Sequence, residues 1–294
     1  MSIERRTFLK GAVAGVGTAL ASHTVAAPAA FDPYERVPLG KTGLKVSRVG
    51  LGTGMKGWLR RSNHTRMGEA RFDALVAHCY DQGVRLFDMA DLYGTHTHFA
   101  RAIKKYPRES YTIISKVWVH PRGLPEEERP VADVSVERFL KELGMDYIDI
   151  VLLHCQTKAD WTTALRPHMD ALAKLKEQGK IRAHGASIHS IPALELCATE
   201  PWVESVNTRI NPYGAYMDGP PNQVVPVLKK IHAAGKGVVG MKIIGQGSFR
   251  DDEAKKDKSV DFALNLGCVD AMVVGCETPE EVDDLAARVR KVRC

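Results

Sequence analysis

Residues 85–94 read Arg85-Leu86-Phe87-Asp88-Met89-Ala90-Asp91-Leu92-Tyr93-Gly94. In this stretch a short apolar run is followed directly by a carboxylate, Asp88, and five residues later by a phenol, Tyr93. If the run is a buried β-strand, Asp88 lies at its carboxyl end and Tyr93 lies on the loop beyond it. Short apolar runs of this kind recur along the chain, so the stretch predicts one unit of a repeating architecture.

Eight β-rich runs separated by amphipathic stretches predict the fold. The runs end near Gly52, Ala90, Lys116, His154, Ser187, Asn207, Lys242 and Gly275. Apolar residues recur near helical spacing in Glu69–Tyr80, Val134–Leu143, Trp161–Gln178, Asn222–Ala234 and Pro279–Val292. Helix C-caps are expected at the glycines that follow, Gly83, Gly144, Gly179 and Gly235. Eight strand–helix units favour a single parallel (β/α)8 barrel, a fold that takes about 250 residues.

A doubly wound α/β sheet is the alternative fold. Such a sheet requires a glycine-rich phosphate loop after its first strand, and Gly50-Leu51-Gly52-Thr53-Gly54 matches that loop only in part. The least regular unit of the predicted barrel is the seventh helix, where the charged segment Asp251–Lys258 precedes the apolar segment Asp261–Leu266.

The first 30 residues are typical of a targeting segment. Arg5-Arg6-Thr7-Phe8-Leu9-Lys10 precedes an apolar, uncharged run from Gly11 to Ala21 and then small residues through Ala30. The run is too short to span a bilayer, and the order of its parts indicates a twin-arginine signal peptide cleaved between Ala26 and Ala30. We therefore expect a signal peptide at residues 1–30 and the barrel at residues 31–294. The expected location is the periplasm or another exported site, with the twin-arginine export machinery as a partner; a cytoplasmic location is the alternative.

Composition excludes several other classes of protein. The formal charge is +6, and it falls to +4 without the signal segment, because Arg5, Arg6 and Lys10 leave together with Glu4. No arginine-rich run is present, so nothing indicates a nucleic-acid partner. The six cysteines include no Cys-x-x-Cys pair, which gives no support for a metal site. No stretch after the signal is long and apolar enough to predict a membrane span.

Four polar side chains are expected to meet at one end of the barrel. Lys116 ends the third apolar run and His154 ends the fourth, next to the run that delivers Asp88 and the loop that carries Tyr93. Active sites of (β/α)8 barrels lie at the carboxyl ends of the strands. A phenol has a pKa of about 10 in water, and a nearby cation favours its phenolate. The four residues Asp88, Tyr93, Lys116 and His154 therefore form a candidate catalytic group.

The chain at this point resembles the aldo-keto reductases over nearly all of its mature region. Leu39-Gly40-Lys41-Thr42-Gly43-Leu44-Lys45-Val46-Ser47 with Gly50-Leu51-Gly52-Thr53 looks like the family's opening hairpin and first strand. Phe87-Asp88-Met89-Ala90 with Tyr93-Gly94 is similar to its aspartate and tyrosine motif. Leu143-Gly144-Met145-Asp146-Tyr147-Ile148-Asp149 leads to His154 as in the family, and Lys174-Leu175-Lys176-Glu177-Gln178-Gly179-Lys180-Ile181-Arg182 resembles the approach to strand five.

The resemblance implies NAD(P)(H)-dependent interconversion of a small carbonyl compound and an alcohol. It implies that Tyr93 is the general acid in reduction, that Lys116 lowers the pKa of Tyr93, that Asp88 pairs with Lys116, and that His154 orients the substrate oxygen. A phenol poised in this way can deliver a proton to the oxygen on which charge develops. The hydride belongs to the cofactor.

Expected cofactor contacts depart from the family pattern. The family's Ser-Asn pair after strand five is here Ser187-Ile188, and Asn207 stands where a glutamine is usual. In place of the tyrosine that stacks on nicotinamide, strand seven has Gly240-Met241-Lys242, followed by Gly245-Gln246-Gly247. Met241 can offer the ring a polarisable surface, and Lys242 with Gly245 and Gly247 is a candidate for the pyrophosphate.

The stretch after strand eight bears on which nicotinamide is used. The family often places basic residues around the adenosine 2′-phosphate, whereas this chain has Gly275-Cys276-Glu277-Thr278-Pro279-Glu280-Glu281-Val282-Asp283-Asp284-Leu285. Carboxylates such as Glu281 repel a phosphate dianion and accept from ribose hydroxyls. We therefore expect NADH to be favoured over NADPH. The alternative is that the acids only favour the first turn of helix eight.

Export creates a requirement for the cofactor, since no soluble nicotinamide pool is expected outside the cytoplasm. The hypothesis is that a tightly held cofactor is carried out within the folded protein. Two other functions stay open at this point: a Schiff-base lyase or aldolase that uses Lys116 or Lys242, and a non-catalytic barrel that binds a nucleotide or a partner.

Overall fold

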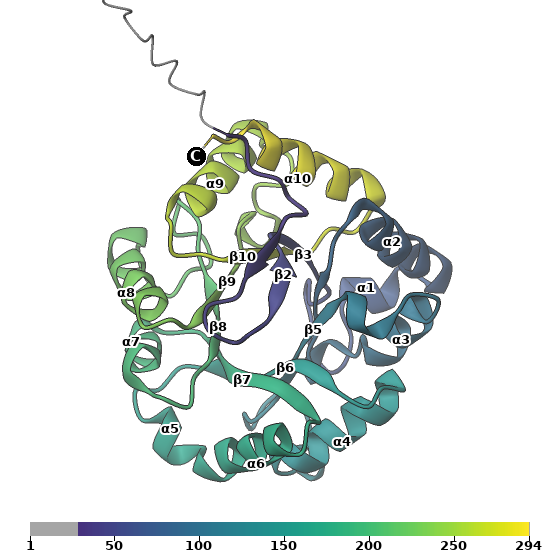
Figure 1. The fold of residues 1–294 in the computed structure, drawn as a ribbon, viewed down its shortest axis with the longest axis vertical. Coiled ribbons are helices and arrows are strands. Elements are labelled where there is room, and N and C mark those ends of the chain that lie inside the picture. The colour runs from purple at the N-terminus through teal and green to yellow at the C-terminus, as the bar shows by residue number, and fades with distance from the viewer. Residues whose placement is uncertain (1–28, 294) are drawn as a thin grey trace, which may run out of the picture.

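The computed structural model describes residues 29–293 and shows eight parallel strands closed into a barrel within that range (Figure 1). The barrel strands are β3 (Val49–Gly52), β4 (Leu86–Asp88), β5 (Thr112–Val117), β6 (Ile148–Gln156), β7 (Ile181–Ile188), β8 (Ser205–Arg209), β9 (Gly237–Met241) and β10 (Ala271–Val274). The barrel closes where β10 pairs with β3, with Met272 opposite Val49. The predicted (β/α)8 barrel is confirmed, and the alternative of an open, doubly wound sheet is wrong because the two end strands pair with each other.

Helices surround the barrel on its outer face (Figure 1). They are α1 (Asn63–Arg66), α2 (Glu69–Gln82), α3 (His96–Ile103), α4 (Ala132–Leu143), α5 (Trp161–Ala164), α6 (Arg166–Glu177), α7 (Ile191–Thr199), α8 (Pro221–Ala233), α9 (Glu253–Asn265) and α10 (Pro279–Lys291). Their apolar stripes pack on the strands: α4 buries Val136, Phe139, Leu140 and Leu143, which lie on one face at helical spacing. None of the helices in the described part of the chain is long and apolar enough to cross a membrane.

Two helices end at the predicted glycines, while the caps of α6 and α8 are Gln178 and Ala234, one residue before Gly179 and Gly235. Gly83 and Gly144 cap α2 and α4 in the left-handed conformation, with φ of 114° and 64°. The single helix expected at Trp161–Gln178 is divided at Leu165 into α5 and α6. Pro167 accounts for the division, because it has no amide hydrogen to donate and its ring excludes the carbonyl one turn earlier. The irregular seventh unit forms one continuous helix, α9, capped by the Asp252 side chain.

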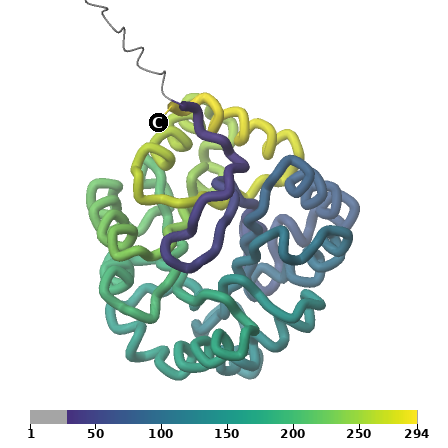
Figure 2. The backbone as a smooth tube through the Cα atoms, viewed as in Figure 1, coloured from purple at the N-terminus to yellow at the C-terminus, as the bar shows by residue number. Residues whose placement is uncertain are grey.

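A β-hairpin closes the amino end of the barrel. Strands β1 (Arg36–Pro38) and β2 (Lys45–Ser47) pair in antiparallel fashion and cross that end of the barrel (Figure 2). Their apolar side chains join the interior layer of the barrel, so that Leu39 and Val46 pack in one cluster with Leu86, Ile114 and Ile150. The hairpin predicted from residues 39–47 is present, and it leaves the carboxyl end of the barrel as the open one.

The two ends of the described chain meet beside α10. Ala30 forms an isolated bridge with Arg293, and the amide of Phe31 donates to the Val292 carbonyl at 3.3 Å. The predicted signal peptide, residues 1–30, lies outside the described residues except for its last two positions.

Candidate active site

Strand alternation brings three of the predicted catalytic residues to one place. Side chains two residues apart on a strand share a face, so Asp88 and Lys116 point inward, above the barrel-filling side chains of Leu86 and Ile114. His154 has the same parity as the interior residue Leu152 on β6. All three are buried at the carboxyl end of the barrel.

Tyr93 reaches the same place from a short 3₁₀ turn, Asp91–Tyr93, that follows β4. Asp91 is buried and anchors the turn, because its carboxylate accepts from Arg60 at 2.8 Å and from Arg138 at 2.7 Å. Two glycines make room for the ring: a Cβ added at Gly54 or Gly57 would lie 2.3 or 2.5 Å from it. The position of the phenol is therefore fixed from both sides.

The centre of the site is a buried ion pair. The Lys116 ammonium lies 2.6 Å from Asp88 Oδ1 and donates to the Met89 carbonyl at 2.9 Å, with its side chain only 1% exposed. Asp88 Oδ1 also accepts from the Asn207 amide at 3.0 Å. Because both charges are buried, the pair is stable only with these added hydrogen bonds.

The phenol and the imidazole lie next to this pair. The Tyr93 hydroxyl is 3.3 Å from His154 Nε2, and the Lys116 ammonium lies 5.1 Å from the centroid of the Tyr93 ring. The edge of Trp118 packs against the His154 ring, with centroids 5.2 Å apart. The structure thus brings together all four residues that the sequence singled out.

Protonation states at the site follow from burial. Burial raises the pKa of Tyr93 well above its ordinary value, and the Asp88 charge raises it further. Burial and the Lys116 charge hold the pKa of His154 well below its ordinary value. The expectation that Lys116 lowers the Tyr93 pKa stays a prediction, because burial sets the net upward direction in the protein alone. At neutral pH the site holds a neutral phenol beside a neutral imidazole.

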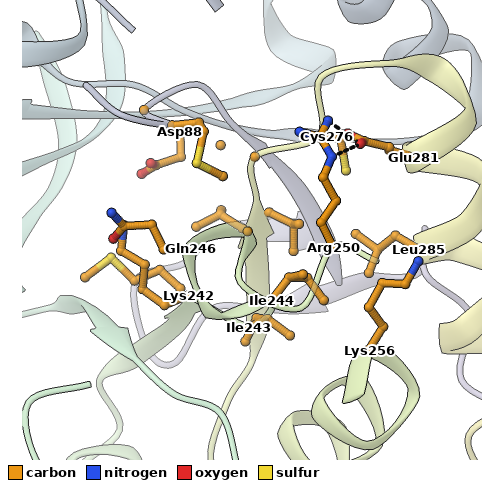
Figure 3. A pocket seen from close by; sticks show the side chains of 18 of the residues that line it. Asp88, Lys242, Ile243, Ile244, Gln246, Arg250, Lys256, Cys276, Glu281 and Leu285 are labelled. Atoms are coloured by element: carbon orange, nitrogen blue, oxygen red, sulfur yellow. Dashed lines mark hydrogen bonds and ion pairs between the residues drawn. The ribbon is translucent and has the colours of Figure 1, made fainter. Parts of the chain in front are cut away.

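A cleft runs from the catalytic group across β9 and β10 to α10. Figure 3 shows Lys242 and Gln246 on the side of this cleft nearer Asp88, with Arg250, Lys256 and Glu281 at the other side. Of the predicted cofactor positions, the cleft is lined by Met241, Lys242, Gly247, Gly275 and Glu281.

Two other predicted positions offer unused polar atoms deep in the barrel. Ser187 and Asn207 lie opposite each other on β7 and β8. Ser187 Oγ and Asn207 Oδ1 are buried and make no hydrogen bond. A buried polar atom without a partner costs free energy, and a hydroxyl beside an amide oxygen matches what a carboxamide needs. This pair fits the carboxamide of nicotinamide.

The loop after β9 differs from the prediction in detail. Gly247 lines the cleft, but Gly245 does not; it turns the chain with φ of 53°, packed against Ser248 and Phe249. Gln246 lines the cleft although sequence reasoning did not single it out. A lone glutamine between two glycines carries no signal of its own.

Sequence reasoning also missed three basic residues at the end of the cleft farther from Asp88, where the adenosine of the cofactor is expected and which is called the adenosine end below. Arg250, Lys256 and Arg288 line the cleft there. Arg250 donates to Glu281 at 2.7 Å and lies 3.3 Å from Glu277, and Glu281 also accepts from the Glu277 amide at 2.7 Å. The acidic stretch is therefore largely neutralised by basic residues from the preceding loop and α9, whose charge the sequence did show.

Comparison with known proteins places the chain. The Aldo/keto reductase family model matches residues 48–291. The chain belongs to this family. Among curated relatives, "Probable aldo-keto reductase 1" of Glycine max is 26% identical over 233 residues, covering 72% of this chain and 60% of that protein. An NADH-specific methylglyoxal reductase of Escherichia coli (strain K12) is 31% identical over 173 residues, covering 52% of each. The chain thus spans about half to three fifths of these relatives.

Solved structures of the family match more of the chain. A protein from Pseudomonas aeruginosa assigned to the aldo-keto reductases is 26% identical, with a TM-score of 0.70 over 88% of this chain and 96% of that one. An aldo-keto reductase from Bacillus halodurans shares the fold, with a TM-score of 0.71 at 18% identity over 89% of this chain and 92% of that one.

The buried ion pair predicts an asymmetric effect on stability. Lys116→Met leaves the Asp88 carboxylate buried without its cation, and we expect the free energy of unfolding to fall by about 3 kcal/mol. Adding Asp88→Asn removes that uncompensated charge, so the double variant is expected to be more stable than Lys116→Met alone. Urea unfolding measures both; a double variant less stable than the single would contradict this account.

Proposed function

We propose that the protein is an NAD(P)(H)-dependent oxidoreductase that interconverts a small carbonyl compound and an alcohol. One observation carries the proposal: a neutral Tyr93 phenol, 3.3 Å from His154 and beside the Lys116–Asp88 pair, lines the cleft. The unpartnered polar atoms of Ser187 and Asn207 are buried in the strands beside it. Family membership supports the proposal.

Each of the four residues has a role that its surroundings support. When bound, the nicotinamide supplies the hydride. Tyr93 donates its proton to the carbonyl oxygen, and His154, held neutral, donates or accepts at the same oxygen to orient it. As Tyr93 gives up its proton, negative charge develops on the phenol near the Lys116 ammonium. Asp88 holds Lys116 in place, and Asn207 holds Asp88 in place through its amide hydrogen bond.

The lysine at the centre is unsuited to a Schiff base. The Lys116 nitrogen is buried and donates to both Asp88 and the Met89 carbonyl. A nucleophilic amine must be neutral and within reach of substrate. Burial lowers the Lys116 pKa and the Asp88 charge opposes this, but the same burial and the two hydrogen bonds keep the nitrogen from the open cleft.

Replacing the phenol tests catalysis directly. We expect Tyr93→Phe to lower kcat by about 10³-fold, as for loss of a general acid, in a panel of aldehydes and ketones assayed with NADH and NADPH. Tyr147→Phe is the matched control, because Tyr147 lies at the opposite end of β6 beneath Arg108. Full activity of Tyr93→Phe would refute the role of Tyr93 as general acid, and no reduction by the unaltered protein would favour a non-catalytic binding protein.

The adenosine end of the cleft supports a preference for NADH. Arg250, the cation closest to Glu277 and Glu281, is engaged by both carboxylates, and Asp284 engages Arg288 at 2.8 Å. A 2′-phosphate would have to displace these carboxylates before it could use the cations, whereas ribose hydroxyls can donate to them. The relative that is named an NADH-specific reductase is consistent with this preference.

Removing one carboxylate is expected to shift the preference. Glu281→Gln leaves Arg250 with Glu277 as its remaining carboxylate partner, and the ratio of NADPH to NADH affinity should rise about fivefold, as expected for an accessible ion pair worth about 1 kcal/mol. Fluorescence titration of the purified protein with each cofactor measures the ratio. Glu280→Gln, the neighbouring position, is the control. Equal or tighter binding of NADPH by the unaltered protein would refute the NADH hypothesis.

We further propose that residues 1–30 direct the folded protein to the twin-arginine export machinery and into the periplasm, with its cofactor held tightly. The arginine pair, the apolar run and the small residues before Phe31 support this. The first strand of the described chain, β1, begins at Arg36, after this segment.

Export can be followed by cell fractionation in a Gram-negative host. The full chain is expected in the periplasm, shortened by about 30 residues, and the Arg5→Lys, Arg6→Lys double variant is expected to stay in the cytoplasm at full length. Exported protein should carry nucleotide absorbance. Export of the double variant, or exported protein without nucleotide, would contradict the respective part of the proposal.

A further inference from the structure

Two cations at the mouth of the barrel have no role in the catalytic group. Arg209 ends β8, two residues after Asn207, and therefore shares its inward face. Lys242 follows β9, the strand that pairs with β8 and sets Met241 opposite Arg209. Lys242 also lines the cleft together with Asp88 and Tyr93. Both cations thus start from neighbouring strand ends, one layer above the catalytic residues.

Lys242 is a half-buried cation without a counter-charge. Its ammonium forms no ion pair with any carboxylate in residues 29–293, and its backbone has a φ of 62°, which residues other than glycine seldom adopt. Its carbonyl accepts from the Gly245 amide at 2.9 Å and from the Asn211 side chain at 3.1 Å. Burial lowers the Lys242 pKa, and the Arg209 charge lowers it further. The loop therefore holds an uncompensated charge at the mouth.

Arg209 is only weakly neutralised. Its closest carboxylate is Asp218, with Nε 3.4 Å from Oδ1, yet neither Arg209 Nε nor either Asp218 oxygen makes a hydrogen bond. The Asp218 side chain is fully buried, and burial raises its pKa to about 6. One Arg209 nitrogen donates to the Tyr216 carbonyl at 3.2 Å. The fork of the guanidinium is left with donors to spare.

Two uncharged groups lie near these cations and the catalytic residues. Cys155 packs against the same apolar cluster as Tyr93, and its sulfur lies 3.4 Å from His189 Nε2. Burial lowers the pKa of His189 to about 2, with Arg209 and Lys242 the next causes, so the imidazole is uncharged. The described charges at the mouth are then the cations Lys116, Arg209 and Lys242 and the carboxylates Asp88 and Asp218. One positive charge remains, which one monoanion would balance.

We propose that Arg209 and Lys242 form an anion subsite, and that the substrate is a carbonyl compound that carries a carboxylate, held there while its carbonyl oxygen meets Tyr93 and His154. The inference rests on the proposed reductase function. A carboxylate matches the planar fork of Arg209 and the point charge of Lys242, and it supplies the single negative charge that the site lacks. Without a bound substrate, Asp218 is the carboxylate nearest to Arg209.

A pair of aldehydes that differ only in charge tests the subsite. 4-Carboxybenzaldehyde and methyl 4-formylbenzoate carry the same reacting group, and we expect kcat/KM to favour the acid by about tenfold or more, as for one charge-assisted hydrogen bond. Arg209→Gln and Lys242→Gln are each expected to raise KM for the acid by about 10- to 100-fold. For Arg209→Gln, KM for the ester and kcat for both substrates should change little.

Two further variants separate the subsite from general charge effects. Asp218→Asn removes the internal competitor for Arg209, so KM for the acid should fall below that of the unaltered protein. Lys258→Gln removes one positive charge from α9, where the ammonium lies 5.6 Å from the Tyr213 ring, and should leave the preference for the acid unchanged.

The outcomes distinguish this inference from the proposed function. Equal kcat/KM for acid and ester in the unaltered protein overturns the subsite, as does a Lys242→Gln variant that loses NADH affinity and activity equally with both aldehydes, because Lys242 then serves the cofactor. If neither aldehyde is reduced, the reductase proposal fails, and calorimetric titration with 4-carboxybenzaldehyde decides the subsite separately. Binding that Arg209→Gln abolishes supports it; no binding by the unaltered protein overturns it.

Discussion

The buried ion pair between Lys116 and Asp88 is the interaction on which the rest of the site depends. Two opposite charges inside a barrel are tolerated only if they are close and if further polar groups complete their hydrogen bonds. Here the 2.6 Å contact between Lys116 and Asp88 joins β4 to β5. The Met89 carbonyl accepts a second hydrogen bond from the Lys116 ammonium, and the Asn207 amide on β8 donates to Asp88. The pair therefore positions one cation beside Tyr93 and also braces three strands of the barrel.

The two ends of the cleft differ in how their charges are balanced. At the adenosine end, Glu277 and Glu281 engage Arg250, and Asp284 engages Arg288. At the mouth of the barrel, Arg209 has a poor counter-ion and Lys242 has none within the described residues. A ligand at the first end has to compete with existing ion pairs, whereas an anion at the second end finds a charge that nothing else balances. The cations at the adenosine end are thus paired with carboxylates, whereas those at the mouth of the barrel are paired poorly or not at all.

The features of the fold and site that could be predicted from the sequence are those set by neighbouring residues, and the features that were missed depend on residues distant in the sequence. The inward positions of Asp88, Lys116 and His154 follow from strand periodicity and from the common edge shared by parallel strand ends, and both can be deduced from local patterns. All eight barrel strands end within two residues of the predicted positions.

The pairing of Arg250 with Glu281 was missed because the two residues are 31 positions apart and only the packing of their elements brings them together. The net upward direction of the Tyr93 pKa had no local signal, because desolvation depends on every neighbour of the ring, while the charge of Lys116 is visible in one residue. The division of α5 from α6 did have a local signal, Pro167, which the helical spacing of apolar residues concealed.

The closure of the barrel has a consequence for how the chain folds. Strand β3, the first of the barrel, is flanked by β4 and by β10. Val49 of β3 pairs with Met272 of β10, and these two residues are separated by most of the chain. Until β10 has been synthesised, one edge of β3 has no strand to pair with, and the cylinder stays open. Such long-range pairing has a high loop-closure cost and forms late. The finished barrel is therefore a property of the complete polypeptide, and a ribosome-bound fragment that already contains Asp88, Tyr93, Lys116 and His154 would still lack the wall between β9 and β3.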